Sequence, residues 1–182
     1  MQAWAKFPWL LHGFSTRVGG FSGVYGGRSL NLGFTKEYRR PAVERNRALF
    51  LKSLGVEGAN VSKVERKLVT LRQVHSDVIH SVDAGGAVRL EPLVGDGMVT
   101  DVPGLVLAVQ TADCLPVIFV DPKRKAVGVF HAGWRGTLRR IVEKGVGEMR
   151  GCFGSDPSSA GCDWAGDSEV LFRSWSGSAG AV

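Results

Sequence analysis

Two residues able to do chemistry, Cys114 and His131, lie at the ends of adjacent apolar runs in the stretch TADCLPVIFVDPKRKAVGVFHAGWRG. Together with a second histidine, these residues would supply a thiolate and two imidazoles. Such a set holds Zn²⁺ with one coordination position open, which is the pattern of catalytic zinc. Alternatively, His131 could activate Cys114 as a nucleophile. A third interpretation gives neither residue a reaction, since cysteine is often a small buried apolar side chain. The spacing contains neither CxxC nor HExxH, so all three interpretations stay open at this point.

The apolar runs around Cys114 predict short buried strands. Residues 105–121 (LVLAVQTADCLPVIFVD) form two such segments, separated near Cys114 and Pro116 because proline disfavours an uninterrupted central strand. Residues 125–131 (KAVGVFH) predict a further strand. Cys114 and His131 are therefore expected where buried strands meet turns, a position at which α/β folds expose functional side chains.

The sequence AGWRG after His131 leads into a predicted helix with Thr137 as its N-cap. A helix N-terminus after a glycine turn offers backbone amides to an anion, and Arg135 could add a bidentate contact. The glycine-rich residues 12–34 predict a surface loop or several tight turns. These residues form either a plain connection or a second anion site, to which Arg17 would supply charge.

Two further elements are expected upstream. Residues 41–54 predict a helix, because a proline suits its first turn and a glycine follows its end. Residues 67–83 (KLVTLRQVHSDVIHSVD) alternate and are rich in β-branched types, which predicts a strand. That strand would contain His75 and His80 on opposite faces, since they are five residues apart, so they should not bind the same ion.

The composition limits the class of protein. The chain has 182 residues, of which 44% are hydrophobic and 22% charged, enough for one domain with a sizeable core. A net charge of +6 permits an anionic partner, but the basic residues are scattered, so no nucleic-acid partner is expected. Three cysteines form no disulfide framework, and no window resembles a signal peptide or a membrane span. We therefore expect a cytoplasmic protein without a membrane partner.

The stretches HGFSTRVGGFS, SLNLG, LRQVHSD, DGMVTDVPGLVLAVQTADCLPVIFVD and VGVFHAGWRGT occur in this order within roughly residues 11 to 155. Together they resemble the laccase-domain family, also called the polyphenol oxidase or YfiH-type family. The resemblance implies an α/β (α+β) fold: a single domain of layered mixed β-sheets with flanking helices, related to a toxin family of cysteine-type hydrolases.

The resemblance also implies a Zn²⁺ ion held by the histidine of QVH, the cysteine of TADC and the histidine of HAGWRG. Here these are His75, Cys114 and His131, whereas His80 matches no ligand position and is expected to be structural or a residue on a strand face. Cu²⁺ is the alternative ion, because copper-dependent oxidation of polyphenols has been assigned to the family and copper binds nitrogen and sulfur more strongly than zinc. A laccase reaction normally uses several coppers and many histidines, and this chain has four histidines, so zinc is favoured.

The implied activity is phosphorolysis of adenosine, inosine, guanosine and methylthioadenosine, together with deamination of adenosine; editing of peptidoglycan precursors has also been proposed for the family. The expected partners are a purine nucleoside and phosphate, and the sequence sets no oligomeric state. The catalytic candidates are Asp113, Arg17 and Asn31, and the substrate-binding candidates are Ser15, Gln73 and Arg135. Asp113 could equally cap a turn, and Trp134 could stack on a purine or anchor the core.

The C-terminal part departs from the family pattern. The segment GCFGSDPSS is family-like, whereas AGCDWAGDSEVLFRSWSGSAGAV shows no motif and no sustained period. We therefore divide the chain into an incomplete laccase-type domain, 1–157, and a non-family tail, 158–182, which we expect to be irregular. Such a switch is typical of a frameshifted or truncated gene. Missing strands would leave sheet edges uncovered, so an inactive remnant is the second functional hypothesis.

Overall fold

The structure, a computed structural model, describes the chain in seven segments. These are residues 7–23, 27–34, 39–56, 68–83, 93–155 and, for the backbone alone, 161–164 and 170–174. Within these segments, no helix combines the length and apolar character that a membrane span requires.

Two five-stranded sheets form the centre of the fold, and both mix parallel and antiparallel pairs. The first sheet has the order β1 (Leu11–Phe14), β11 (Val170–Ser174), β7 (Val106–Gln110), β3 (Leu68–Arg72) and β5 (Leu93–Val94). The second sheet has the order β10 (Gly161–Trp164), β8 (Leu115–Asp121), β9 (Ala126–Ala132), β6 (Gly97–Thr100) and β4 (Ile79–Ser81). The remaining elements are β2 (Val18–Ser22), α1 (Arg40–Ser53), α3 (Trp134–Leu138) and α4 (Ile141–Phe153).

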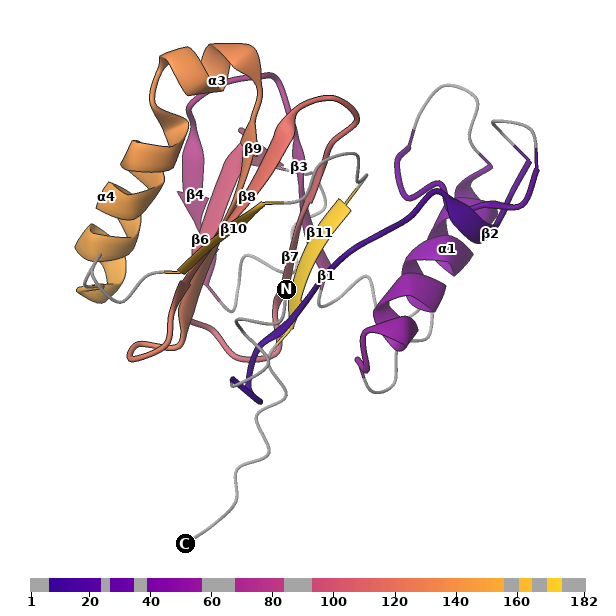
Figure 1. The fold of residues 1–182 in the computed structure, drawn as a ribbon, viewed down its shortest axis with the longest axis horizontal. Helices are drawn as coiled ribbons and strands as arrows, with labels where there is room; N and C mark the ends of the chain where they lie inside the picture. The colour runs from indigo at the N-terminus through magenta and orange to yellow at the C-terminus, as the bar shows by residue number, and fades with distance from the viewer. Residues whose placement is uncertain are drawn as a thin grey trace, which may run out of the picture.

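The sheets pack face to face, with a helix on the outer side of each (Figure 1). Strand periodicity explains this layering, because successive side chains point to opposite faces. In β9, Val127 and Val129 join the core between the sheets, whereas Phe130 joins the core beneath α4. In β7, Leu107 faces the second sheet and Ala108 faces α1. The expected layered α/β fold with mixed sheets and flanking helices is thus confirmed.

Phe130 occupies a space that three glycines leave open. A Cβ atom on Gly97 would lie 2.7 Å from the Phe130 ring, and one on Gly128 would lie 2.6 Å from it. A Cβ atom on Gly145 in α4 would also contact the ring. Because these positions carry no side chain, α4 and β6 approach the Phe130 ring closely.

In the described part of the chain, three segments pass from the first sheet to the second. The crossing segments are residues 73–78 between β3 and β4, residues 95–96 between β5 and β6, and residues 111–114 between β7 and β8. The strands that precede them are β5, β3 and β7, which are parallel neighbours, so all three crossings start from the same end of the first sheet. This end of the two sheets is where the candidate site is built.

The prediction of one strand over residues 67–83 is wrong. The described part forms β3 and β4, which belong to different sheets, and His75 lies between them with a left-handed backbone (φ 60°). His75 and His80 therefore do not share a strand. His80 lies in β4, and its Nε2 atom is 2.9 Å from the carbonyl oxygen of Val94, which agrees with a structural role.

Other local predictions had mixed outcomes. The helix expected over 41–54 is confirmed as α1. Thr137 is not a helix N-cap, because it lies inside α3, and α4 begins after Arg140. The glycine-rich residues 12–34 are more ordered than the predicted loop, since they contain most of β1 and all of β2.

The region predicted as an irregular tail contributes two strands. β10 pairs with β8 at the edge of the second sheet, and β11 pairs with both β1 and β7 in the first. An irregular course is thus wrong for residues 161–164 and 170–174. The rest of the tail lies outside the described residues, and the domain boundary after residue 157 stays a prediction.

Candidate metal centre

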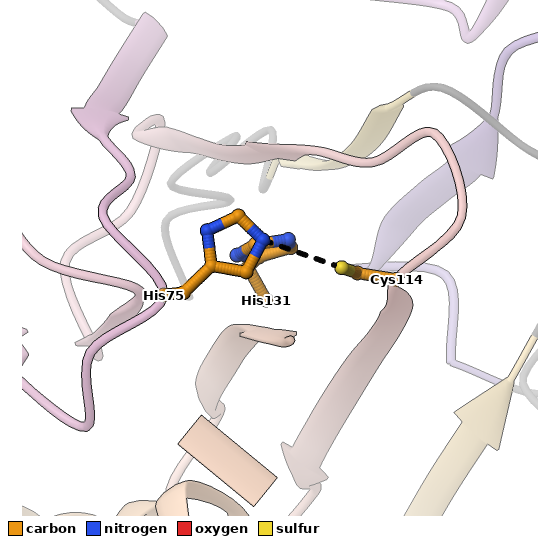
Figure 2. A group of neighbouring side chains, drawn as sticks. All are labelled: His75, Cys114 and His131. Atoms are coloured by element: carbon orange, nitrogen blue, oxygen red, sulfur yellow. Dashed lines mark hydrogen bonds between the residues drawn. The ribbon is translucent and has the colours of Figure 1, made fainter. Parts of the chain in front are cut away.

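The three residues that the resemblance implies as ligands come together at the end of the sheets where the crossings lie. The Nδ1 or Nε2 atoms of His75 and His131 and the Sγ atom of Cys114 all lie within 4.8 Å of one another. Figure 2 shows the Cys114 sulfur directed at the His75 ring, with Sγ 3.6 Å from Nε2. The two imidazole rings meet edge to face, at a centroid distance of 4.8 Å.

The donor set and its spacing fit a small tetrahedral cation. With Zn–N near 2.05 Å and Zn–S near 2.3 Å, two tetrahedral ligands have N and S atoms about 3.6 Å apart. The measured separation between Cys114 Sγ and His75 Nε2 is 3.6 Å. His131 is buried while His75 and Cys114 are partly exposed, so the group is reachable from solvent. This group could hold a metal ion.

A buried aspartate that the sequence did not single out joins the two histidines. Asp96 is fully buried, and its carboxylate accepts a hydrogen bond from His131 Nδ1 at 2.8 Å. It also accepts from the backbone amides of Val74, His75 and Ser76 and from the Ser76 hydroxyl. The only signal in the sequence was its place in the family-like stretch DGMVTD, and no spacing rule connects residue 96 with residue 75.

The charges of this pair follow from burial and hydrogen bonding. Burial alone would raise the pKa of Asp96, but the hydrogen bonds from Ser76, His131 and the loop amides outweigh it and hold that pKa below its usual value. Burial lowers the pKa of His131, partly offset by Asp96, and the neighbouring His75 lowers it further. His131 is therefore a neutral imidazole near pH 7, the form that binds metals.

Gly133 makes room for the His75 ring. A Cβ atom at position 133 would lie 2.5 Å from His75 Cδ2. Gly133 directly follows β9 and precedes α3, so the glycine of the HAGWRG stretch serves the close approach of a side chain from another crossing segment.

A pocket of about 540 Å³ opens beside the three ligand atoms. Its walls include two cations that the sequence analysis missed, Arg47 from α1 and Arg72 at the end of β3. Arg47 also donates from Nε to the carbonyl oxygen of Leu32 and lies 4.4 Å above the Phe34 ring. The other lining residues are Phe34, Thr70, Leu71, Gln73, His75, Gln110, Ala112, Asp113, Cys114 and His131.

The predicted polar residues divide by position. Asp113 and Gln73 line the pocket, although the amide of Gln73 is engaged with the backbone of Gln110. Arg135 is absent from the pocket lining and lies over the exposed Trp134 ring, with 4.9 Å between the guanidinium carbon and the ring centroid. Trp134 is 63% exposed, so it does not anchor the core.

Arg17, Ser15 and Asn31 lie in or beside the glycine-rich segment, and none of them is among the residues that line the pocket. Arg17 is exposed. Ser15 and Asn31 are buried, and each has a side-chain atom, Oγ and Nδ2 respectively, without a hydrogen-bond partner. The backbone carbonyl of Asn31 accepts a hydrogen bond from Asn46 of α1, which anchors this segment to the helix.

The fold and the site define a class of protein: a layered α/β domain with a candidate metal centre where two sheets meet. Residues 11–163 match the family described as "Multi-copper polyphenol oxidoreductase laccase", and the chain belongs to this family. The expected family is thus confirmed.

Relatives and solved structures agree with this membership. A purine nucleoside phosphorylase of Deinococcus radiodurans is 38% identical over 139 residues, which cover 76% of this chain and 49% of the relative. One from Streptomyces coelicolor is 41% identical over 147 residues, or 80% of this chain and 56% of the relative. The crystal structure of YlmD from Geobacillus stearothermophilus superposes with a TM-score of 0.74 at 30% identity, covering 88% of this chain and 59% of that one. The chain therefore spans about half the length of these curated relatives.

Proposed function

We propose that the chain carries the site of a zinc-dependent purine nucleoside phosphorylase, in which His75, Cys114 and His131 hold the ion. The observation that carries this proposal is one pocket lined by the three ligand residues and by two guanidinium groups, Arg47 and Arg72. Zn²⁺ in a three-ligand site supplies a Lewis acid at an open coordination position. The names of the relatives, which are purine nucleoside phosphorylases, support the choice of substrate class.

The arginines suit the anionic co-substrate. In phosphorolysis an oxygen of inorganic phosphate bonds to C1′ of the ribose while the bond from C1′ to the purine nitrogen breaks, giving ribose 1-phosphate and the free base. Guanidinium groups bind phosphate oxygens in a bidentate manner. Arg47 and Arg72 line the pocket and are better placed for this role than Arg17 and Arg135, which do not.

Asp113 is the candidate for proton transfer. It is exposed, lines the pocket and directly precedes Cys114, so its carboxylate can exchange a proton with the purine nitrogen that departs. Ser15 and Asn31 support the site at a distance in this proposal, because they belong to the segment that Asn46 anchors. A reducing compartment such as the cytoplasm suits the function, since the Cys114 thiol must stay free.

The same site could deaminate adenosine, in which water replaces the amino group at C6 and ammonia leaves. Copper-dependent oxidation of polyphenols is less well supported. The chain has four histidines, and two of them, His12 and His80, are outside the His75–Cys114–His131 group, so the ligand supply suits one ion rather than several.

The experiment combines metal analysis with product analysis. Purified protein should contain about one zinc per chain, Cys114→Ala should lose it, and Cys152→Ala, the matched control, should keep it. Incubation with adenosine and phosphate should yield adenine and ribose 1-phosphate. Absence of zinc, or zinc that survives Cys114→Ala, contradicts the metal assignment. Zinc without products supports the inactive remnant, and inosine without adenine would reduce the activity to deamination.

A further inference from the structure

One buried carboxylate contacts both histidine-bearing segments of the metal centre. Oδ1 of Asp96 accepts from the amide of His75 at 3.0 Å and from His131 Nδ1 at 2.8 Å. Oδ2 accepts from the amides of Val74 and Ser76, at 3.2 and 2.6 Å, and from the Ser76 hydroxyl at 2.6 Å. We propose that Asp96 is a positioning residue, which sets the tautomer of His131 and the conformation of the loop that presents His75.

The carboxylate of Asp96 determines which ring nitrogen of His131 carries the proton. An ionised carboxylate accepts hydrogen bonds and donates none, so the proton of neutral His131 must lie on Nδ1. The Nε2 atom then keeps its lone pair and can bind a cation. A second hydrogen bond, from the amide of His131 to the carbonyl oxygen of Asp96 at 2.7 Å, keeps the two residues in register.

Three consecutive backbone amides hold the loop that presents His75. Residues 74, 75 and 76 all donate to the same carboxylate, and His75 between them has φ 60°. Histidine is one of the few non-glycine residues enriched in this left-handed conformation, but it remains a minority state for histidine, so the three amide contacts hold His75 in the turn. The turn directs the His75 ring over Gly133 toward Cys114.

Replacing Asp96 by asparagine impairs one of the two tasks, because neither orientation of the amide group can accept from all the donors. With its oxygen toward His131, its NH₂ group faces the amides of Val74 and Ser76, which are also donors. With its NH₂ group toward His131, it favours the Nε2-protonated tautomer, whose Nε2 lacks a lone pair. Either orientation weakens metal binding, although the shape of the side chain is kept.

Asp121 is a matched control. It is also a fully buried aspartate, and its Oδ1 accepts from the amides of Lys123 and Arg124 at 2.9 and 3.1 Å. It is the last residue of β8 and lines no part of the pocket. Both Asp96→Asn and Asp121→Asn should lower the unfolding free energy. If the role of Asp96 were purely structural, the two variants would bind metal with the same affinity.

The experiment measures zinc affinity by competition with a chromogenic chelator and the His131 tautomer by ¹⁵N NMR of the imidazoles. This inference rests on the proposed zinc site for the affinity arm only. We expect Asp96→Asn to weaken zinc binding about 10- to 100-fold, and Asp121→Asn to leave it unchanged. In metal-free wild-type protein, His131 should be protonated on Nδ1.

Two results overturn the inference: wild-type zinc affinity in Asp96→Asn, or a wild-type His131 protonated on Nε2. If Asp96→Asn does not fold, the tautomer in metal-free wild-type protein still decides. If the wild-type protein binds no zinc, the metal assignment fails, and the same tautomer measurement tests the positioning role separately.

Discussion

The side chain of Gln73 and the backbone of Gln110 form a closed pair of hydrogen bonds. Gln73 Nε2 donates to the Gln110 carbonyl oxygen at 2.7 Å, and the Gln110 amide donates to Gln73 Oε1 at 2.7 Å. Gln73 begins one crossing segment and Gln110 ends β7 just before another. The pair therefore connects the segment that carries His75 with the segment that carries Cys114.

Gln73→Met should lower the unfolding free energy by about 1–3 kcal/mol, because it removes both hydrogen bonds while keeping the length of the side chain. Gln73→Glu should destabilise more, since a carboxylate oxygen would face the Gln110 carbonyl. Urea denaturation measures both changes. Equal stability of the two variants would contradict the paired arrangement.

The cysteines should differ in their response to metal removal. Cys114 should resist iodoacetamide in zinc-loaded protein and react about tenfold faster or more after chelation, since a metal-bound thiolate is shielded. Mass spectrometry of the labelled peptides measures the rates. Fast alkylation of Cys114 in zinc-loaded protein would instead indicate a catalytic thiol.

Cys152 is the internal control for that measurement. The alkylation rate of Cys152 should not depend on zinc, because Cys152 lies in α4 and is not part of the metal centre. Its Sγ atom is 3.4 Å from a carboxylate oxygen of Glu148. Burial raises the pKa of Cys152, and Glu148 adds to this despite an opposing hydrogen bond from Ser81. Its thiolate fraction near pH 7 is therefore below that of a free cysteine, and its alkylation should continue to accelerate above pH 9.0.

Arg72→Gln should raise the KM for phosphate about tenfold or more, because a charge-assisted contact within the pocket is lost. Arg135→Gln removes a guanidinium outside the pocket lining and should leave that KM unchanged. Initial rates at varied phosphate give both values. The reverse order of effects would favour the helix turn after β9 as the phosphate site.

Asp77 should contribute an acid-sensitive part of the stability. The hydrogen bond from Lys144 lowers the pKa of Asp77 below 3.8, with smaller contributions from charges on Lys144 and Arg139. Because the folded pKa is the lower one, this contribution is complete above about pH 3.8 and is lost as the pH falls through the folded value. Melting temperatures from pH 2.5 to 6 should fall less steeply at the acid end in Asp77→Asn. Lys144→Gln should reproduce that profile, and additive effects of the two substitutions would exclude the pair.

Much of the layered fold follows from local patterns. The apolar runs predicted β7, β8 and β9, because these strands are buried on both faces. The helix α1 was predicted from the proline at its start and the glycine after its end. The family motifs predicted which histidines and which cysteine meet.

The rest depended on contacts that are distant in sequence. The alternation over 67–83 continues through Val74 and Val78, so nothing local shows that the strand breaks there; Asp96 breaks it by accepting the amides of the loop. No pattern in the sequence singles out Arg47 or Arg72. Only the packing of α1 against the first sheet, and the end of β3 beside it, bring them to one pocket.

The left-handed backbone of His75 means that the residue best suited to the turn and the residue needed for the proposed metal centre can differ at this position. A non-glycine residue in this conformation typically loses about 1 kcal/mol, and asparagine tolerates it well. His75→Asn should therefore keep its unfolding free energy within about 1 kcal/mol of the wild type while binding no metal. The turn itself therefore does not require an imidazole at position 75, and the ring matters only for the group that it forms with Cys114 and His131.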